Sequence, residues 1–277
     1  MGDASDIGFG LMWQKKNEPV GKDFAEFLAW LARASGLPLV ARCALSYEEL
    51  HGMIRRGEVG AAWVPPIVYL HLERERVVAP LVTHTRAAGV TYESVLIVPM
   101  TSSTRSIEAL RGARAAWVDP WSAAGYVLPR LKLATLGVDP RETFASETFY
   151  GSHDACVRAV LDGEADVGGT YARRDADGKL VRGGWTEMKE AEGRIHVLTS
   201  FGPIPSDLIV AHQSLPAKAR QALVRALVSV PHDPVAPLVQ RVFGVQLFRE
   251  GGLPTFGALR RALDGAVARG LFDGLPR

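Results

Sequence analysis

The sequence predicts an α/β protein with two lobes, and three observations support that prediction. Short apolar runs rich in Val, Ile and Ala alternate with segments of helical periodicity along the chain. Such alternation implies parallel sheets whose two faces are both covered by helices. The pattern also starts twice, with a break near Val98 and a return near Gly202. We therefore expect two βα series joined by two crossing segments.

The first series is built from strands that are each followed by a helix. Ser46 is placed to cap one of these helices, while Gly36 and Gly57 are placed to end two of them. The expected strands lie at 6–13, 38–43, 59–64, 77–84 and 92–99, and the expected helices at 22–36, 46–57 and 66–75.

The second series repeats this alternation. Its helix at 122–137 contains Pro129, which should bend or break it. The other expected elements are a short helix at 106–112, extended segments at 113–119, 142–150, 165–171, 195–201 and 204–211, a loop or excursion at 179–194, and helices at 152–163, 216–230, 234–243 and 255–269. We expect 1–97 and 203–277 to form the first lobe and 98–202 the second.

Composition excludes several classes of protein. The chain has 277 residues, 47% of them hydrophobic, and a formal net charge of +2 without a cluster of Lys and Arg, which argues against nucleic-acid binding. The sequence has no apolar run of about 18 residues, so it predicts no membrane-spanning helix. The two cysteines, Cys43 and Cys156, are too few for a disulfide framework, and the scattered histidines predict no metal site. We expect no cofactor.

The first residues, "MGDASDIGFGLMW", show no basic region followed by an apolar run, so the given sequence shows no signal peptide. Two interpretations stay open. Either the protein is cytoplasmic, or an export signal was removed and the protein is periplasmic or on the cell surface.

No catalytic set emerges from spacing. The chain has neither a G-x-S-x-G elbow nor a P-loop. The stretch "GFGLMW" contains the G-x-G of a dinucleotide turn, but Trp13 stands where the third glycine belongs. The sequence therefore predicts a protein that is not an enzyme.

Two expected helix starts are candidates for anion binding, because ligands of α/β sheets bind where strands end and helices begin. The first is Ser122 followed by Ala123, Ala124 and Gly125, where small residues let a ligand approach the backbone. The second is Ser152 with His153 in the first turn. Each has a plain alternative: an ordinary capped helix, and a surface histidine.

Four blocks of the sequence occur in the order found in one known family. They are "SYEEL…GEVGAAWVPPIVY", "YESVLIVP", "SIEALRGARAAWVDPWSAAGYVLPRL" and "TFYGSHDACVRAVLDGEADVGGTY". From about residue 7 to about residue 230 the chain resembles the phosphate/phosphonate (PhnD-type) substrate-binding proteins of ABC transporters, which have the type 2 periplasmic binding protein fold. The resemblance implies two α/β lobes with a ligand cleft between them that closes by a hinge on an oxyanion.

The resemblance also implies which residues reach the ligand. Those expected at the site are Tyr47, Pro66 in the Pro-Pro turn, Tyr92, Trp121, Ser122, the N–H groups of Ala123 and Ala124, His153, and Asp207 as an acid for a ligand amine. The implied partners are a small anionic ligand and an ABC transporter permease, with the protein a monomer.

The chain departs from the family at one helix start. Relatives usually have a Ser-Thr-Ser-Gly run, whereas this chain has Ser122, Ala123, Ala124 and Gly125, and so lacks two hydroxyl donors. The loss should cost a phosphonate about a hundredfold in affinity. Either the ligand is less charged, such as a carboxylate or an aromatic acid lying on Trp121 and Trp13, or other donors replace the hydroxyls. In the plain alternative, Trp121 faces the core.

The leading functional hypothesis is therefore a solute-binding protein for an ABC transporter. Two alternatives remain: a cytoplasmic enzyme on the same fold, similar to chorismate-dehydratase-like proteins, and a sensor domain for a small anion.

Overall fold

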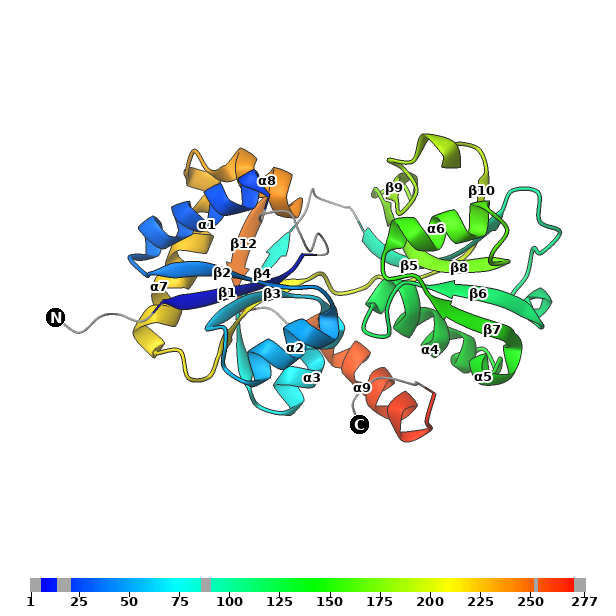
Figure 1. Ribbon diagram of the computed structural model, residues 1–277, viewed down its shortest axis with the longest axis horizontal. Helices are drawn as coiled ribbons and strands as arrows, with labels where there is room; N and C mark the ends of the chain where they lie inside the picture. Colours follow the sequence, from blue (N-terminus) through cyan, green and yellow to red (C-terminus); the bar gives the residue numbers. More distant parts are fainter. Residues whose placement is uncertain (1–5, 14–20, 86–90, 252–253, 272–277) are drawn as a thin grey trace. The chain divides into compact units, whose positions relative to one another are not determined.

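The computed structural model describes residues 6–13, 21–85, 91–251 and 254–271, which divide into two units (Figure 1). Unit 1 comprises residues 1–88 and 206–254, and unit 2 comprises 89–205 and 255–277. The chain thus passes between the units three times, once more than the sequence predicts. The expected lobe boundaries differ from these units at three segments, because 91–97, 203–205 and the residues from 255 onward belong with unit 2.

Unit 1 is built on a six-stranded mixed sheet. Strands β1, β2 and β3 are mutually parallel, whereas β11 pairs antiparallel with both β3 and β4. The prediction of a wholly parallel sheet is wrong here, because β11 follows a crossing between units rather than a helical connection within one. In order of pairing, the strands are β12 (Leu247–Glu250), β4 (Val78–Thr85), β11 (Leu208–His212), β3 (Ala61–Val64), β1 (Ile7–Met12) and β2 (Leu39–Ala44).

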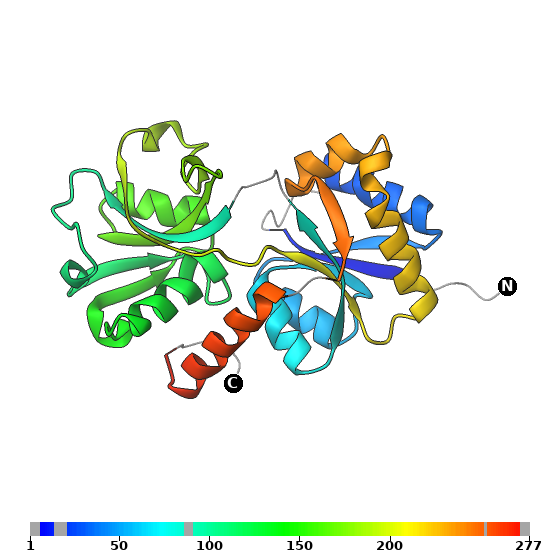
Figure 2. The ribbon, with the colours of Figure 1, turned by 180° about the vertical axis from the view of Figure 1, so that it is seen from behind.

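Helices cover both faces of this sheet (Figures 1 and 2). On one face, α1 (Lys22–Ser35), α7 (Ala217–Val228) and α8 (Ala236–Phe243) form a core with the strands, centred on the fully buried Phe9 and Phe27. On the other face, α2 (Tyr47–Arg55) approaches β1 so closely that a Cβ on Gly10 would lie 3.2 Å from Leu50 Cδ1. Helix α3 (Pro66–Arg74) packs beside α2.

Unit 2 has the same arrangement of its central strands. Strand β6 lies between two parallel neighbours, β7 and β8, and the strand that enters from the crossing, β5, runs antiparallel to β8. In order of pairing, the strands are β10 (Ile195–Phe201), β5 (Thr91–Pro99), β8 (Val167–Arg174), β6 (Ala113–Trp117) and β7 (Phe144–Phe149), with β9 (Leu180–Gly183) added to β8.

The two faces of this second sheet carry different helices. Helix α6 (His153–Leu161) contributes Cys156, Val157 and Val160 to a core with β5, β6 and β8. The opposite face carries a short π-helix, η2 (Ala123–Val127), which continues into α4 (Leu128–Thr135). The small helix α5 (Pro140–Thr143) precedes β7, and three 3₁₀ turns, at Glu108–Leu110, Lys189–Ala191 and, in unit 1, Val230–His232, complete the elements.

The last described helix, α9 (Pro254–Ala268), lines a pocket together with α4, and a buried arginine binds the segment that follows it. Arg130 donates from Nε and Nη2 to the carbonyl of Leu271 at 3.2 and 3.1 Å. Its Nη1 also contacts the carboxylate of Glu147, which accepts a hydrogen bond from Trp117 at 2.6 Å. These contacts explain why the end of the chain belongs with unit 2.

Most predicted elements are confirmed. Ser46 caps α2 by accepting the N–H of Glu49, and Gly36 ends α1 in the left-handed conformation at φ 69°. The short strands β9 and β12 were not predicted, and the expected helix at 106–112 is a single 3₁₀ turn. Both cysteines are free thiols. Within the described ranges, no helix is long and apolar enough to cross a membrane. Residues 1–5 of the start discussed above lie outside the description.

Candidate functional site

The helix start after β6 is held against the sheet by a π-helical turn. The hydroxyl of Ser122 accepts the N–H of Gly125 at 3.0 Å, and the carbonyl of Ser122 accepts from both Tyr126 and Val127. All of Ser122, Ala123 and Ala124 are at most 5% exposed. The predicted cap at Ser122 is therefore confirmed, with a wider turn than an α-helix has.

Pro129 and the wide turn explain why the carbonyls of Gly125 and Ala124 accept hydrogen bonds from outside the helix. Because proline has no N–H, the carbonyl of Gly125 lacks its usual helical donor and accepts from Val118 N–H of the preceding segment at 3.3 Å. The wide turn also leaves the carbonyl of Ala124 without a helical donor. This carbonyl accepts a hydrogen bond from the hydroxyl of Ser94 on β5 at 2.7 Å. The helix is thus joined to β5 and to the residue that follows β6. The predicted break at Pro129 takes the form of a change from π-helix to α-helix.

The backbone N–H groups of Ala123 and Ala124 form no hydrogen bond with any described residue. They belong to the first turn of a helix, where N–H groups lack helical partners and carry a partial positive charge. These two groups are therefore available as donors at the end of β6.

The second helix start lies at the end of β7. Ser152 caps α6 by accepting the N–H of Ala155 at 3.1 Å, as predicted. His153 places Nδ1 2.9 Å from the hydroxyl of Thr170 and its ring 4.9 Å from the ring of Tyr171. Burial of the imidazole lowers the pKa of His153 to about 4, so the ring is neutral at pH 7.

Sequence reasoning missed two residues at this edge, Tyr171 and Arg173. The ring of Tyr92, which was predicted, lies 5.8 Å from the ring of Tyr171. The guanidinium of Arg173 lies 5.6 Å from the ring centre of Tyr171. The signal in the sequence was "TYARR" at the end of a predicted strand, where Tyr171 and Arg173 alternate onto one face.

Unit 1 collects the remaining predicted residues at the carboxyl ends of its own strands. Tyr47 is the first residue of α2 after β2, and Pro66 is the first residue of α3 after β3. Asp207 precedes β11 and accepts a hydrogen bond from the indole of Trp63 at 3.1 Å. The indole ring of Trp63 is itself stacked between His84 and Phe243, with ring centres at 5.2 and 4.5 Å.

Trp121 and Trp13 are the two tryptophans expected to contact an aromatic ligand. Trp121 is only 3% exposed, and its backbone N–H donates to the carboxylate of Asp119 at 2.8 Å. Trp13 lies at the end of β1, where its buried indole nitrogen has no hydrogen-bond partner within the part of the chain that the structure describes.

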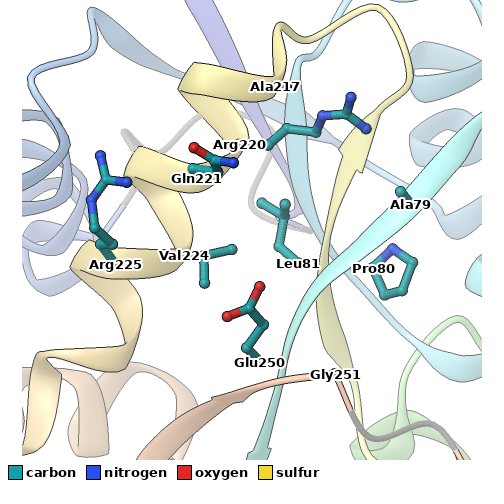
Figure 3. Close-up of a pocket in the computed structure, with 10 residues that line it drawn as sticks. All are labelled: Ala79, Pro80, Leu81, Ala217, Arg220, Gln221, Val224, Arg225, Glu250 and Gly251. Carbon is teal, nitrogen blue, oxygen red and sulfur yellow. The ribbon is translucent and has the colours of Figure 1, made fainter.

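A groove of about 570 Å³ in unit 1 lies elsewhere (Figure 3). It is bordered by Arg220 and Arg225 of α7, by Pro80 near the start of β4 and by Glu250 of β12. Because β4 is parallel to β3, its start is at the opposite edge of the sheet from Tyr47, Pro66 and Asp207. This groove is therefore separate from the candidate site.

With two βα units and helix starts at the strand ends, the chain has the architecture of periplasmic substrate-binding proteins. The family model described as "ABC transporter, phosphonate, periplasmic substrate-binding protein" matches residues 9–251. The chain belongs to this family. The family consists of transport proteins rather than enzymes, so the alternative of a cytoplasmic enzyme is not favoured.

Solved structures agree on the fold. PhnD1 from Prochlorococcus marinus, in complex with methylphosphonate, is 15% identical with a TM-score of 0.77, covering 96% of this chain and 99% of that one. A Xanthomonas citri protein bound to ATP is 20% identical with a TM-score of 0.77, covering 96% and 98%. A binding-protein component of an ABC phosphonate transporter from Pseudomonas aeruginosa is 18% identical with a TM-score of 0.74, covering 96% and 97%.

Proposed function

We propose that this protein captures a small phosphonate- or phosphate-like oxyanion and delivers it to an ABC transporter permease in the periplasm. The observation that carries the proposal is the start of η2, where the N–H groups of Ala123 and Ala124 have no partner among described residues. Backbone donors at a helix start bind anions without any change in protonation. The protein acts as a monomer whose lobes close on the ligand by a hinge.

His153 is the side-chain donor in this proposal. Its low pKa keeps the imidazole neutral, so one ring nitrogen carries hydrogen and the other accepts. Nδ1 lies 2.9 Å from the Thr170 hydroxyl. We assign the hydroxyl as the donor, which places the ring hydrogen on Nε2, where it donates to a ligand oxygen. Tyr92 adds its phenol at the same edge.

A carboxylate is the second candidate ligand, because Ala123 and Ala124 supply no hydroxyl groups to surround the three oxygens of a phosphonate. A thermal-shift series with methylphosphonate, phosphate, sulfate, acetate and benzoate separates the two classes, since a bound ligand stabilises the folded protein by mass action. We expect the largest shift with methylphosphonate. A shift with carboxylates alone would reject the phosphonate in favour of the second candidate.

Site placement is tested by His153→Ala combined with Tyr92→Phe. We expect weaker methylphosphonate binding in calorimetry and a ligand-free melting temperature close to that of the wild type. Unchanged affinity would show that the site lies elsewhere. Ala123→Ser is the converse variant: a hydroxyl restored at this start should strengthen methylphosphonate binding by about tenfold, the effect of one hydrogen bond to a charged group.

A further inference from the structure

Three arginines occur where β8 pairs with β9, and two of them form ion pairs with glutamates. Arg174 pairs with Glu93 at 3.1 Å, and Arg182 of β9 pairs with Glu187 at 3.4 Å. Arg173 forms no ion pair or hydrogen bond with any residue in the described ranges, and its Nε is buried without an acceptor. Because an unsatisfied buried donor on a cation is costly, this position needs an explanation.

Cross-strand pairing places Arg173 on the face that carries η2. Arg173 lies opposite Tyr92, and Tyr171 lies opposite Ser94, whose hydroxyl donates to the carbonyl of Ala124. Directly opposite residues share a face of the sheet. Tyr171 is therefore level with Ala124 of η2. Arg173 lies two residues further along β8, a distance of about 7 Å.

The aromatic ring of Tyr171 connects the predicted site residues to this cation. The imidazole of His153, the phenol of Tyr92 and the guanidinium of Arg173 all lie around it, at 4.9, 5.8 and 5.6 Å. A cation at this distance from a ring is within range of its π-face, which holds the guanidinium but leaves its N–H groups to bind an acceptor. Those N–H groups form a planar fork suited to a carboxylate.

Local charge makes this acceptor anionic. Arg182 stands directly opposite Arg173 on β9, so two like charges face each other across the strands. Asp119, near η2, is already engaged by the N–H of Trp121. Glu93 and Glu187 pair with the other two arginines. The carboxylate of Asp175, in the turn after β8, accepts the backbone N–H groups of Asp177 and Lys179.

We propose that Arg173 binds a second negatively charged group of the ligand, a carboxylate joined by a short spacer to the oxyanion held at η2. The ligand class is then a phosphonocarboxylate. This inference rests on the proposed function, because it takes the oxyanion at η2 as given. It also runs against the expectation of a ligand amine at Asp207, since a cation beside the site repels an amine.

Three probes that differ in a single group test the proposal by calorimetry: methylphosphonate, phosphonoacetate and 2-aminoethylphosphonate. The wild type should bind phosphonoacetate about tenfold or more tightly than methylphosphonate, and 2-aminoethylphosphonate most weakly. Arg173→Gln should abolish the preference for phosphonoacetate over methylphosphonate. Arg182→Gln removes the same charge from the facing strand and should retain the preference.

Each outcome distinguishes the two proposals. If methylphosphonate binds and phosphonoacetate binds no more tightly, the role of Arg173 is rejected while the proposed function stands. If Arg182→Gln lowers the preference as much as Arg173→Gln, the effect is general electrostatics and the specific role is again rejected. If none of the three probes binds, the proposed function fails and the role of Arg173 fails with it.

A charge reversal provides a readout that a purely structural arginine would not change. Arg173→Glu should reverse the order of affinity, so that 2-aminoethylphosphonate binds more tightly than phosphonoacetate. Melting of each variant without ligand checks that it is folded. A folded Arg173→Glu protein that keeps the wild-type order of affinity would overturn the proposal.

Discussion

The two units have the same topology but place different chemistry at equivalent positions. In each, the strand after the central one is followed by a serine cap: Ser46 accepts the N–H of Glu49, and Ser152 accepts that of Ala155, both at 3.1 Å. The next residue is Tyr47 in unit 1 and His153 in unit 2. The backbone frame is thus shared, and the first side chain of each helix differs.

The wider surroundings differ in the same direction. The edge of unit 1 presents Asp207 against the indole of Trp63, whereas that of unit 2 presents Arg173 and the neutral His153 beside the π-turn of η2. The fold therefore fixes where helix starts meet the strand ends, while single residues decide whether an edge attracts an anion. We infer that recognition of negative charge is concentrated in unit 2.

Among substitutions that test this difference between the units, Gly169→Ala should have the largest effect on stability and on oxyanion binding. A Cβ there would lie 2.8 Å from both the Gly125 carbonyl and the Trp117 ring, so η2, the Trp117 ring or both must move. Unfolding in urea should show a loss of about 2 kcal/mol, with weakened oxyanion binding. Gly10→Ala in unit 1 is the control, because its nearest neighbours are side chains at 3.2 Å and the cost should be below about 1 kcal/mol. Equal losses would mean that the position of η2 does not depend on this contact.

A smaller effect comes from the paired caps. Ser46→Ala and Ser152→Ala each remove one cap and should each lower stability by about 1 kcal/mol in urea unfolding. Oxyanion affinity should fall in Ser152→Ala alone. If both variants bind as the wild type does, the start of α6 takes no part in binding.

The smallest effect concerns pH. The folded pKa of His153, about 4, is below its ordinary value of 6.5, so the unfolded chain binds the proton more readily. The stability contributed by the neutral ring is complete above pH 6.5 and is lost as the pH falls towards 4. Between pH 7 and 6 the loss should be below about 1 kcal/mol. His153→Gln should flatten this slope in urea unfolding measured across that range, and Tyr47→Gln should not.

The elements that local chemistry determines were predictable. Helix ends at Gly36 and caps at Ser46, Ser122 and Ser152 depend only on neighbouring residues, and all four were predicted correctly. The antiparallel course of β5 and β11 was not predictable, because periodicity shows that a strand exists but not its direction. Strand β12 has four residues, too few for a clear period.

The site follows the same rule. Arg173 was not predicted, because its significance is that Glu93 of the facing strand pairs with Arg174 and leaves Arg173 without an acid. That depends on the pairing of β8 with β5 and β9, which only the folded structure supplies. Trp121 shows the converse, since the sequence left open whether it lines the site, and the structure gives it an exposed fraction of 3%.

The three passages of the chain between the units have a consequence for when folding can finish. Unit 1 lacks β11, α7, α8 and β12 until residues beyond 206 are made, and unit 2 lacks α9 and the Leu271 carbonyl that receives Arg130 until the last residues appear. Synthesis delivers the N-terminal part first. Neither unit can therefore be complete until its last segment, which ends at 254 in unit 1 and begins at 255 in unit 2, has been made. A chain cut near residue 205 would therefore contain neither unit in complete form.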